Sequence, residues 1–288
     1  MTDSSLASGK GHRDENFPVA SALIAKRHRP AVMAFYRVAR MSDDIADHAT
    51  ASAQTKLAEL AAVEGSLTGA ATSVPEAVAL RNILSERGIP PQHALDLLTA
   101  FKRDVTQNRY ADWADLLDYC RYSAAPVGRF MLDVHGEDRS TWAASDALCA
   151  ALQINNHLQD CGKDYRAIDR VYLPADALAA AGVDVTALGG ATASPALRGV
   201  IGDLARRTAG LLDQAKPLAG QVRDKRLSME IGVIHRLAVS LNARLTIRDP
   251  LSERVHHRSW EALGGAFLGA GDAVIACLKA RQSRPAEA

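Results

Sequence analysis

The sequence predicts an all-α protein, and three observations carry that prediction. Of the 288 residues, 48% are hydrophobic, alanine and leucine foremost, and only 5% are aromatic. Such a composition favours helices over strand-rich sandwiches or barrels. Apolar residues recur at helical spacing in roughly ten segments, and no convincing apolar–polar alternation marks a strand. We therefore expect one helical domain over residues 15–280, with flexible termini at 1–14 and 281–288.

Each expected helix follows from a periodic segment and from the residues that interrupt it. Pro30 suits the first turn of a helix, where its missing N–H has no cost. Pro126 falls inside a helical segment, so we expect a kink near it. Ser145 or Asp146 is the expected N-cap of a helix that Gly162 follows. The expected helices are 15–25, 29–48, 50–66, 75–86, 91–105, 112–134, 147–161, 196–219, 226–247 and 260–280.

Two breaks between these helices are longer than a turn. Residues 170–174 (RVYLP) form too short a segment for a domain, and we expect an ordered loop there. Residues 182–195 are rich in Gly, Ala and Thr, a composition typical of a flexible connection.

Charge and cysteine usage exclude several classes of protein. The formal net charge is +1, and no dense Lys/Arg stripe indicates a nucleic-acid partner. No stretch of about 18 apolar residues could span a bilayer, and no apolar signal segment stands at the N-terminus. The cysteines at positions 120, 149, 161 and 277 lack metal-ligand spacing, so we expect reduced interior thiols. These features predict a cytoplasmic protein.

Two segments place a pair of aspartates on one face of a helix. Residues three and four positions apart share a helical face, and in both segments polar side chains continue that face along an otherwise apolar helix. The two stripes are Tyr36, Arg40, Asp43 and Asp47, and Gln153, Asn156, Asp160 and Asp164. Asp44 lies about 100° away around the helix, which places it outside the first stripe.

Both acid pairs are unfavourable as isolated features. Like charges at i,i+4 cost a few tenths of a kcal/mol, and each pair falls near the end of its expected helix, where the helix dipole favours cations. A buried carboxylate needs a counter-charge, and magnesium, with its oxygen ligands and its affinity for substrate phosphates, would supply one. A solvated helix face, capping and salt bridges are the alternatives that spacing alone leaves open.

At these residues the sequence resembles the squalene/phytoene synthase family of head-to-head prenyl transferases. Residues 40–47 (RMSDDIAD) and 153–164 (QINNHLQDCGKD) match the two aspartate-rich motifs of that family. The match covers most of residues 15–175 in the right order. It extends through Phe17, Tyr36, Arg109, Tyr110 and the segments 119–128 and 170–174.

The resemblance implies a fold, a cofactor and a set of site residues. The fold would be an isoprenoid-synthase-like helical bundle with a central cavity. Its two motifs, on facing helices, would bind the Mg²⁺ ions that hold a prenyl diphosphate. The metal ligands would then be Asp43, Asp47, Asn156, Asp160 and Asp164. The substrate-binding residues would be Phe17, Tyr36, Arg40, Gln153 and Asn156. The catalytic residues would be the four aspartates and Tyr119.

Residues 15–21 and 119–129 resemble most one branch of the family. That branch converts presqualene diphosphate, made by a sister enzyme, to a hydroxylated product without a reductant, so we expect no NADPH. Ala125-Pro126 stands where the family usually has Gly-Thr. Condensation of two prenyl diphosphates, as in presqualene diphosphate or phytoene synthesis, is the closest alternative. A catalytically silent helical scaffold that binds a sister synthase is another.

Three further groups of residues have expected roles. Arg40, Tyr36 and Lys163 would donate hydrogen bonds to the diphosphate. Phe17, Tyr119 and Tyr122 would stabilise a carbocation through their ring faces, although core packing is the alternative for each. We expect a surface role for a last group of residues, which either contacts the inner face of a membrane or belongs to an ordinary surface helix. The group is Arg254, His256, His257, Arg258 and Trp260.

Overall fold

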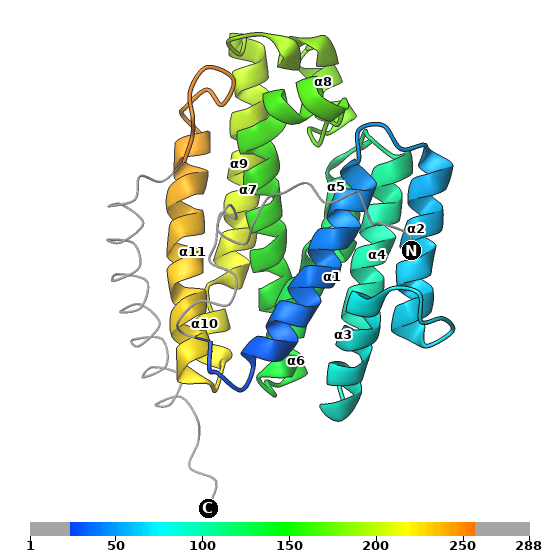
Figure 1. Cartoon of the computed structure of the whole chain (residues 1–288). Coiled ribbons are helices and arrows are strands. Elements are labelled where there is room, and N and C mark those ends of the chain that lie inside the picture. The colour runs from blue at the N-terminus through cyan, green and yellow to red at the C-terminus, as the bar shows by residue number, and fades with distance from the viewer. Residues whose placement is uncertain (1–23, 257–288) are drawn as a thin grey trace, which may run out of the picture. The chain divides into compact units, whose positions relative to one another are not determined.

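The computed structural model describes residues 24–256, and within that range the chain is helical without a strand (Figure 1). The predicted all-α class is therefore confirmed. The expected helices 15–25 and 260–280 fall wholly or mostly outside the described residues. The α-helices are α1 (Arg29–Asp47), α2 (Ala53–Thr68), α3 (Pro75–Glu86), α4 (Gln92–Thr106), α5 (Trp113–Ser123), α6 (Ala125–Val134), α7 (Trp142–Ile168), α8 (Ala175–Ala180), α9 (Pro195–Ala215), α10 (Leu218–Gln221) and α11 (Lys225–Leu245).

Prolines and capping side chains explain many of the helix starts. Proline stands in the first turn of α1, α3 and α9, where it needs no hydrogen-bond acceptor. The Ser194 side chain accepts from the N–H of Leu197 at the start of α9, and Asp224 caps α11 in the same manner. Such caps satisfy N–H groups that have no partner inside the helix.

Contacts divide the chain into two compact units, and the chain passes from one to the other after Gln107, inside α6 after Gly128, and after Gly136. The first unit contains α1 to α4 together with Arg129–Gly136. In it α1 packs against α2, α3 and α4, and the ring of Phe35 stacks on that of Phe130 with centroids 3.9 Å apart. Leu60, Leu80 and Leu98 are fully buried in the same core. One domain over residues 15–280 stays a prediction.

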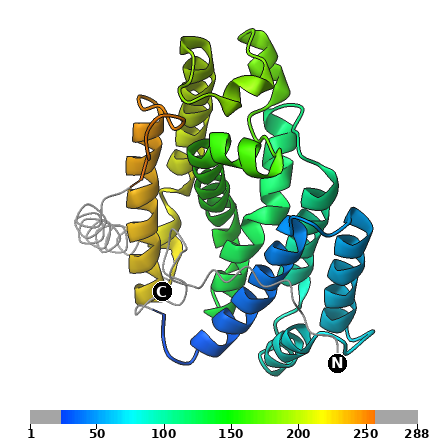
Figure 2. The same cartoon turned by 45° about the horizontal axis from the view of Figure 1, so that its top comes forward.

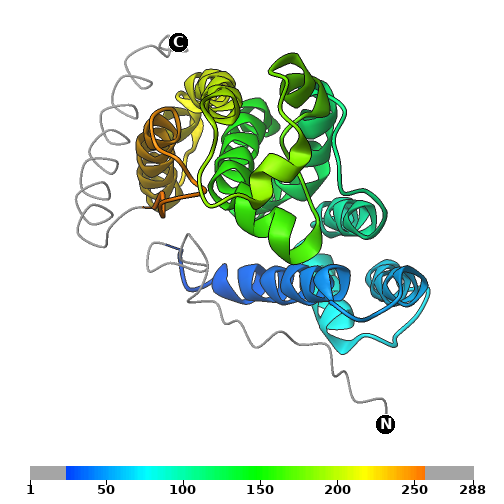
Figure 3. The same cartoon turned by 90° about the horizontal axis from the view of Figure 1, so that it is seen from above.

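The second unit is built around α7. This helix packs against α9, α11 and α5, and α9 and α11 stay beside it in the turned views of Figures 2 and 3. The buried Asn155 of α7 donates to the carbonyl of Ala238 at 3.2 Å and accepts from Asn242 at 2.9 Å, both on α11. These paired amides satisfy polar groups that would otherwise be buried without partners.

The expected boundaries of α7 are wrong at both ends. The helix begins at Trp142 rather than Ala147, so Ser145 and Asp146 lie inside it and do not cap it. It continues through Gly162 to Ile168, and Asp169 ends it with a left-handed φ of 51°. A Cβ on Gly162 would lie 3.2 Å from the carbonyl oxygen of Leu188. A side chain at position 162 would therefore crowd the Leu188 carbonyl, and Gly162 does not mark a helix end.

The expected helix 112–134 is two helices. The break falls at Ala124, two residues before Pro126, and α6 begins at once after it. This confirms the interruption near Pro126, which follows from the steric clash of its ring with the preceding turn. The segment 182–195, expected as a flexible connection, contains a 3₁₀ turn (Val185–Gly189), which Leu188 anchors in the core.

The loop 170–174 lies beside the residues that precede α5. The N–H of Val171 donates to the carbonyl of Asn108 at 2.9 Å, and that of Ala175 donates to the carbonyl of Tyr110 at 2.9 Å. Arg109 adds an ion pair of 2.5 Å with Asp169. Two segments about 60 residues apart in sequence are thereby joined. The loop is ordered, as expected, and brings Tyr172 beside α7.

Candidate active site

The first acid stripe lies on the last three turns of α1. Tyr36, Arg40 and Asp43 are half-buried, and Asp47, the last residue of the helix, is exposed. Arg40 donates to the carboxylate of Asp43 at 3.0 Å. The side chain of Asp43 is 42% exposed, so this carboxylate is held by a cation on one side and accessible on another.

Asp44 belongs to the same cluster, although helical phase placed it outside the stripe. Arg40 donates to Asp44 at 2.6 Å while it also donates to Asp43, and the Asp44 side chain is only 13% exposed. The long guanidinium side chain reaches both i+3 and i+4. The i,i+4 spacing of Arg40 and Asp44 was the signal in the sequence that could have identified this residue.

The second acid stripe is a continuous line on α7. Gln153, Asn156, Asp160 and Asp164 are all half-buried, whereas the residues on the opposite face of the helix are buried in the core. Lys163 approaches Asp160 at 3.7 Å, with its own side chain 68% exposed. A pair this long and this exposed contributes little to stability, and so Asp160 is not locked to that lysine.

Neighbouring polar residues of α7 have structural roles. Asn155 forms the amide pair with α11, and the Gln159 amide donates to the carbonyl of Val255 and lies 2.8 Å from Nδ1 of His256. The polar residues of 153–164 thus divide into an outer stripe and an inner set. Helical phase separates the two sets, but it does not say which one faces the core.

Four rings form a buried cluster next to the second stripe. Tyr119 of α5 lies 5.1 Å from Tyr110 and 5.6 Å from Tyr172 between ring centroids, and 6.1 Å from His157. His157 stacks on Tyr172 with centroids 3.3 Å apart. The expected site residue Tyr119 is 2% exposed, which is the environment in which a ring face interacts most strongly with a cation.

His157 was not predicted as a site residue from the sequence. Its surroundings in the folded chain determine its protonation state. It is 4% exposed, and its Nε2 has no hydrogen-bond partner among the described residues. Burial, reinforced by the nearby Arg170 guanidinium, lowers the pKa of this imidazole to about 3. The ring is therefore neutral at physiological pH.

Cys120 and Cys161 are interior thiols, as expected, whereas Cys149 is only half-buried. Burial raises the pKa of both Cys120 and Cys161 to about 12, so neither presents a thiolate for nucleophilic or metal chemistry at neutral pH. Cys277 lies outside the described residues.

The donor chemistry of the second stripe fits magnesium. Asp160, Asp164 and Asn156 offer carboxylate and amide oxygens from successive turns of one helix, half-buried and thus open on one side. Magnesium takes such oxygen ligands and completes its coordination with water or substrate phosphate. Asp43 and Asp47 offer the same donor type on α1. Asp43 and Asp160 belong to different compact units. That the two carboxylates face each other across one site therefore stays a prediction.

Some expected site residues lie outside these clusters or outside the described chain. Phe17 and the segment 15–21 precede the described residues, and His257, Arg258 and Trp260 follow them. Tyr122 is half-buried, and Arg121 lies 5.8 Å from its ring centroid. It takes no part in the four-ring contacts around Tyr119 given above.

Comparison with known proteins identifies close relatives. The family model described as squalene/phytoene synthase matches residues 11–261. A hydroxysqualene synthase of Rhodopseudomonas palustris is 58% identical over 268 residues, which cover 93% of this chain and 92% of that protein. One of Zymomonas mobilis is 53% identical over 272 residues, with 94% and 92% covered. The crystal structure of squalene synthase HpnC from Alicyclobacillus acidocaldarius superposes with a TM-score of 0.71 at 31% identity, covering 80% of this chain and 87% of that one.

Proposed function

The chain belongs to the squalene/phytoene synthase family, and from this premise we propose that it is a hydroxysqualene synthase. Its substrates would be presqualene diphosphate and water, and its products hydroxysqualene and diphosphate. The observation that carries the proposal is the identity of 58% and 53% to two hydroxysqualene synthases over more than nine-tenths of each protein. The acid stripes and the aromatic cluster supply groups suited to this chemistry.

The reaction begins when the bond between carbon and the diphosphate oxygen breaks. Magnesium ions bound at Asp43, Asp47, Asn156, Asp160 and Asp164 would neutralise the charge that develops on the leaving diphosphate. Arg40 would add hydrogen bonds to phosphate oxygens, because a guanidinium offers several donors in one plane. Its contacts with Asp43 and Asp44 hold the group in place before substrate binds, which reduces the entropy lost on binding.

The cation left by ionisation must rearrange before water captures it. A dry, aromatic environment protects such a cation, and the buried rings of Tyr119 and Tyr172 would supply one. A ring face contributes about 1–2 kcal/mol to a desolvated cation. Water then adds its oxygen to the cation and releases a proton, so no electrons are transferred. No reductant is needed for this balance, and we therefore propose that NADPH is not used.

Two further expectations belong to the proposal. The product is apolar, so contact with a membrane would ease its release, and a sister synthase that makes presqualene diphosphate would be a natural partner. Among residues 24–256 no helix is long and apolar enough to cross a bilayer. Arg254 and His256 are the members of the expected lipid-contact group that fall within this range.

Product analysis tests the function. The purified full chain is incubated with presqualene diphosphate and Mg²⁺, with and without NADPH, and the extracted products are identified by mass spectrometry. Hydroxysqualene formed equally in both samples is the expected result. Parallel incubations contain farnesyl or geranylgeranyl diphosphate alone. Condensation products from these, squalene that requires NADPH, or no conversion of presqualene diphosphate would each contradict the proposal.

A further inference from the structure

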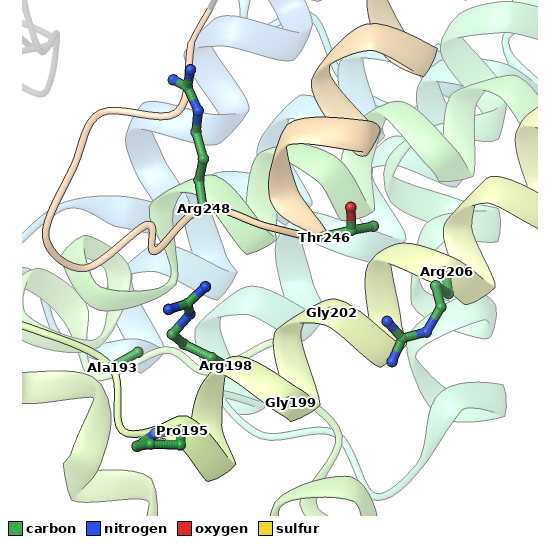
Figure 4. Close-up of a pocket in the computed structure, with 8 residues that line it drawn as sticks. All are labelled: Ala193, Pro195, Arg198, Gly199, Gly202, Arg206, Thr246 and Arg248. Atoms are coloured by element: carbon green, nitrogen blue, oxygen red, sulfur yellow. The ribbon is translucent and has the colours of Figure 1, made fainter.

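A cavity in the second unit is lined by three arginines and by none of the site residues described above. Its volume is about 380 Å³, and Figure 4 shows it between the first half of α9 and the segment that follows α11. The lining residues are Ala193, Pro195, Arg198, Gly199, Gly202, Arg206, Thr246 and Arg248. The guanidinium groups of Arg198 and Arg206 flank the cavity, and the lining contains no acid, which indicates a site for an anion.

Two glycines leave the space between Arg198 and Arg206 open. Gly199 and Gly202 lie one turn apart on α9, and a Cβ on Gly199 would meet no atom within 4 Å. In Figure 4, Arg198 and Arg206 flank this glycine face, and the Arg206 guanidinium extends toward Gly202. Arg248 extends away from the other two. Side chains at these two positions would fill the cavity floor, so the glycines make room for a ligand.

The acids that contact these arginines lie outside the cavity lining. Arg206 pairs with Asp203, both being more than half exposed, and Arg248 approaches Glu253 at 3.9 Å. Exposed pairs of this kind are weak, so both guanidinium groups can exchange partners for a phosphate. Asp249 also lies near Arg198, but its carboxylate already accepts from the N–H groups of Ala193 and Leu251.

An exposed aliphatic side chain stands at the rim of the same cavity. Ile247 is 68% exposed, more than the other exposed large hydrophobic residues of the described chain, and it lies between the lining residues Thr246 and Arg248. Arg198 donates to its carbonyl at 2.8 Å, which holds this segment against the cavity. An arginine-lined cavity beside a protruding aliphatic residue matches the two layers of a membrane surface, the headgroups and the acyl chains.

We infer that this end of α9 and α11 docks on an anionic phospholipid surface, with a headgroup phosphate in the arginine cavity and Ile247 inserted among the acyl chains. The inference does not depend on the proposed function, because vesicle binding is measured without turnover. It also uses residues different from the group at positions 254–260.

Vesicle flotation with the full chain tests this docking. Vesicles of phosphatidylcholine alone are compared with vesicles that also contain phosphatidylglycerol, and only the latter should bind, more weakly as salt rises. The double variant Arg206→Gln/Arg248→Gln should lower the partition coefficient by about fivefold per arginine. Ile247→Asn should lower it by about tenfold, since an apolar side chain no longer leaves water. Equal binding to both kinds of vesicle, or to neither, would overturn the inference.

A steric variant separates the cavity from general positive charge. Gly199→Leu fills the cavity, retains all three arginines and favours the helix. Gly210→Leu is its matched control, because Gly210 lies on the same helix and its Cβ would also meet no atom within 4 Å. Lys216→Gln removes one exposed charge from the far end of α9. We expect Gly199→Leu to reduce vesicle binding at least fivefold and both controls to leave it unchanged. Equal binding by Gly199→Leu and Gly210→Leu would refute a headgroup site.

Calorimetric titration of inorganic phosphate and of diphosphate, without vesicles, distinguishes the two sources of the anion. The expected result is weak binding of either ion and tight binding of vesicles. Saturable binding of a free ion that Gly199→Leu abolishes, with vesicle binding unchanged in that variant, would assign the cavity to a soluble anion. That outcome would overturn the lipid assignment.

Discussion

Arg40 and Asp44 are joined by a hydrogen bond of 2.6 Å on α1, while the same guanidinium donates to Asp43 at 3.0 Å. The two aspartates therefore share one cation, and they differ in exposure, with Asp43 at 42% and Asp44 at 13%. The more exposed carboxylate can exchange partners with an incoming ligand. The less exposed one holds the guanidinium in position, which assigns Asp44 a positioning role.

Replacing Asp44 by asparagine tests that role. A neutral amide holds the guanidinium less strongly than a carboxylate does, so KM for presqualene diphosphate should rise roughly fivefold, with a smaller change in kcat. Steady-state kinetics measure both. The control is Asp213→Asn, at an exposed position on α9. A fall in kcat with KM unchanged would contradict a positioning role.

The acid stripes are tested by Asp43→Asn and, separately, by Asp160→Asn. Each change keeps the size of the side chain and removes one anionic ligand, so turnover should fall about a hundredfold or more. The far-ultraviolet circular dichroism spectrum of each variant should match that of the unmodified chain, since both side chains are at least partly exposed. If either variant retains full activity, its stripe does not bind the diphosphate.

Removal of divalent metal should reversibly stop the reaction. Carboxylates alone repel a diphosphate, so after dialysis against EDTA turnover should be lost, and added Mg²⁺ should restore it. The thermal unfolding midpoint, recorded on the same samples, should change little without substrate. Full activity in EDTA would exclude a metal requirement.

Two glycine substitutions test the packing around α7. A Cβ on Gly128 would lie 2.4 Å from Oγ of Ser145 and 2.6 Å from Sγ of Cys149, so Gly128→Ala should lower the free energy of unfolding by about 1–3 kcal/mol through overpacking. Gly210 is also helical but open, and Gly210→Ala should raise the same quantity by about 0.5–1 kcal/mol. Urea denaturation measures both. Equal effects in the two variants would contradict the packing explanation.

His157 predicts a loss of stability in mild acid. Its pKa is about 3 in the folded chain, whereas an imidazole in an unfolded chain titrates near 6.5. Below about pH 6.5 the unfolded state therefore binds a proton that the folded state rejects, and the free energy of unfolding falls by up to about 1.4 kcal/mol per pH unit. The loss ends near the folded pKa.

The variant His157→Phe keeps a ring against Tyr172 and removes the titration. Urea denaturation between pH 7 and pH 5 should show a shallower decline for this variant, by roughly 1 kcal/mol per pH unit at its steepest. Identical slopes for the variant and the unmodified chain would show that the imidazole is not buried as described.

Features that local periodicity encodes could be predicted from the sequence alone. The all-α class, the start of α1 at Arg29, the bounds of α3 and the two acid stripes follow from residues close together in the chain. The comparisons confirmed the family that the motifs in these segments suggested. The site residues themselves stay predictions that the variants above address.

What each polar residue faces depends on contacts between helices that are distant in sequence. Periodicity places Asn155 and Asn156 side by side, but the contacts with α11 make the first structural and leave the second in the half-buried stripe. The sequence suggests a helix end at Gly162 because glycine usually disfavours a helix, yet Gly162 lies within α7, where a Cβ would be 3.2 Å from the Leu188 carbonyl. The burial of His157 and the arginine cavity likewise depend on segments distant in sequence. Such contacts have no local signature, since a residue's own neighbours carry no record of what packs against them.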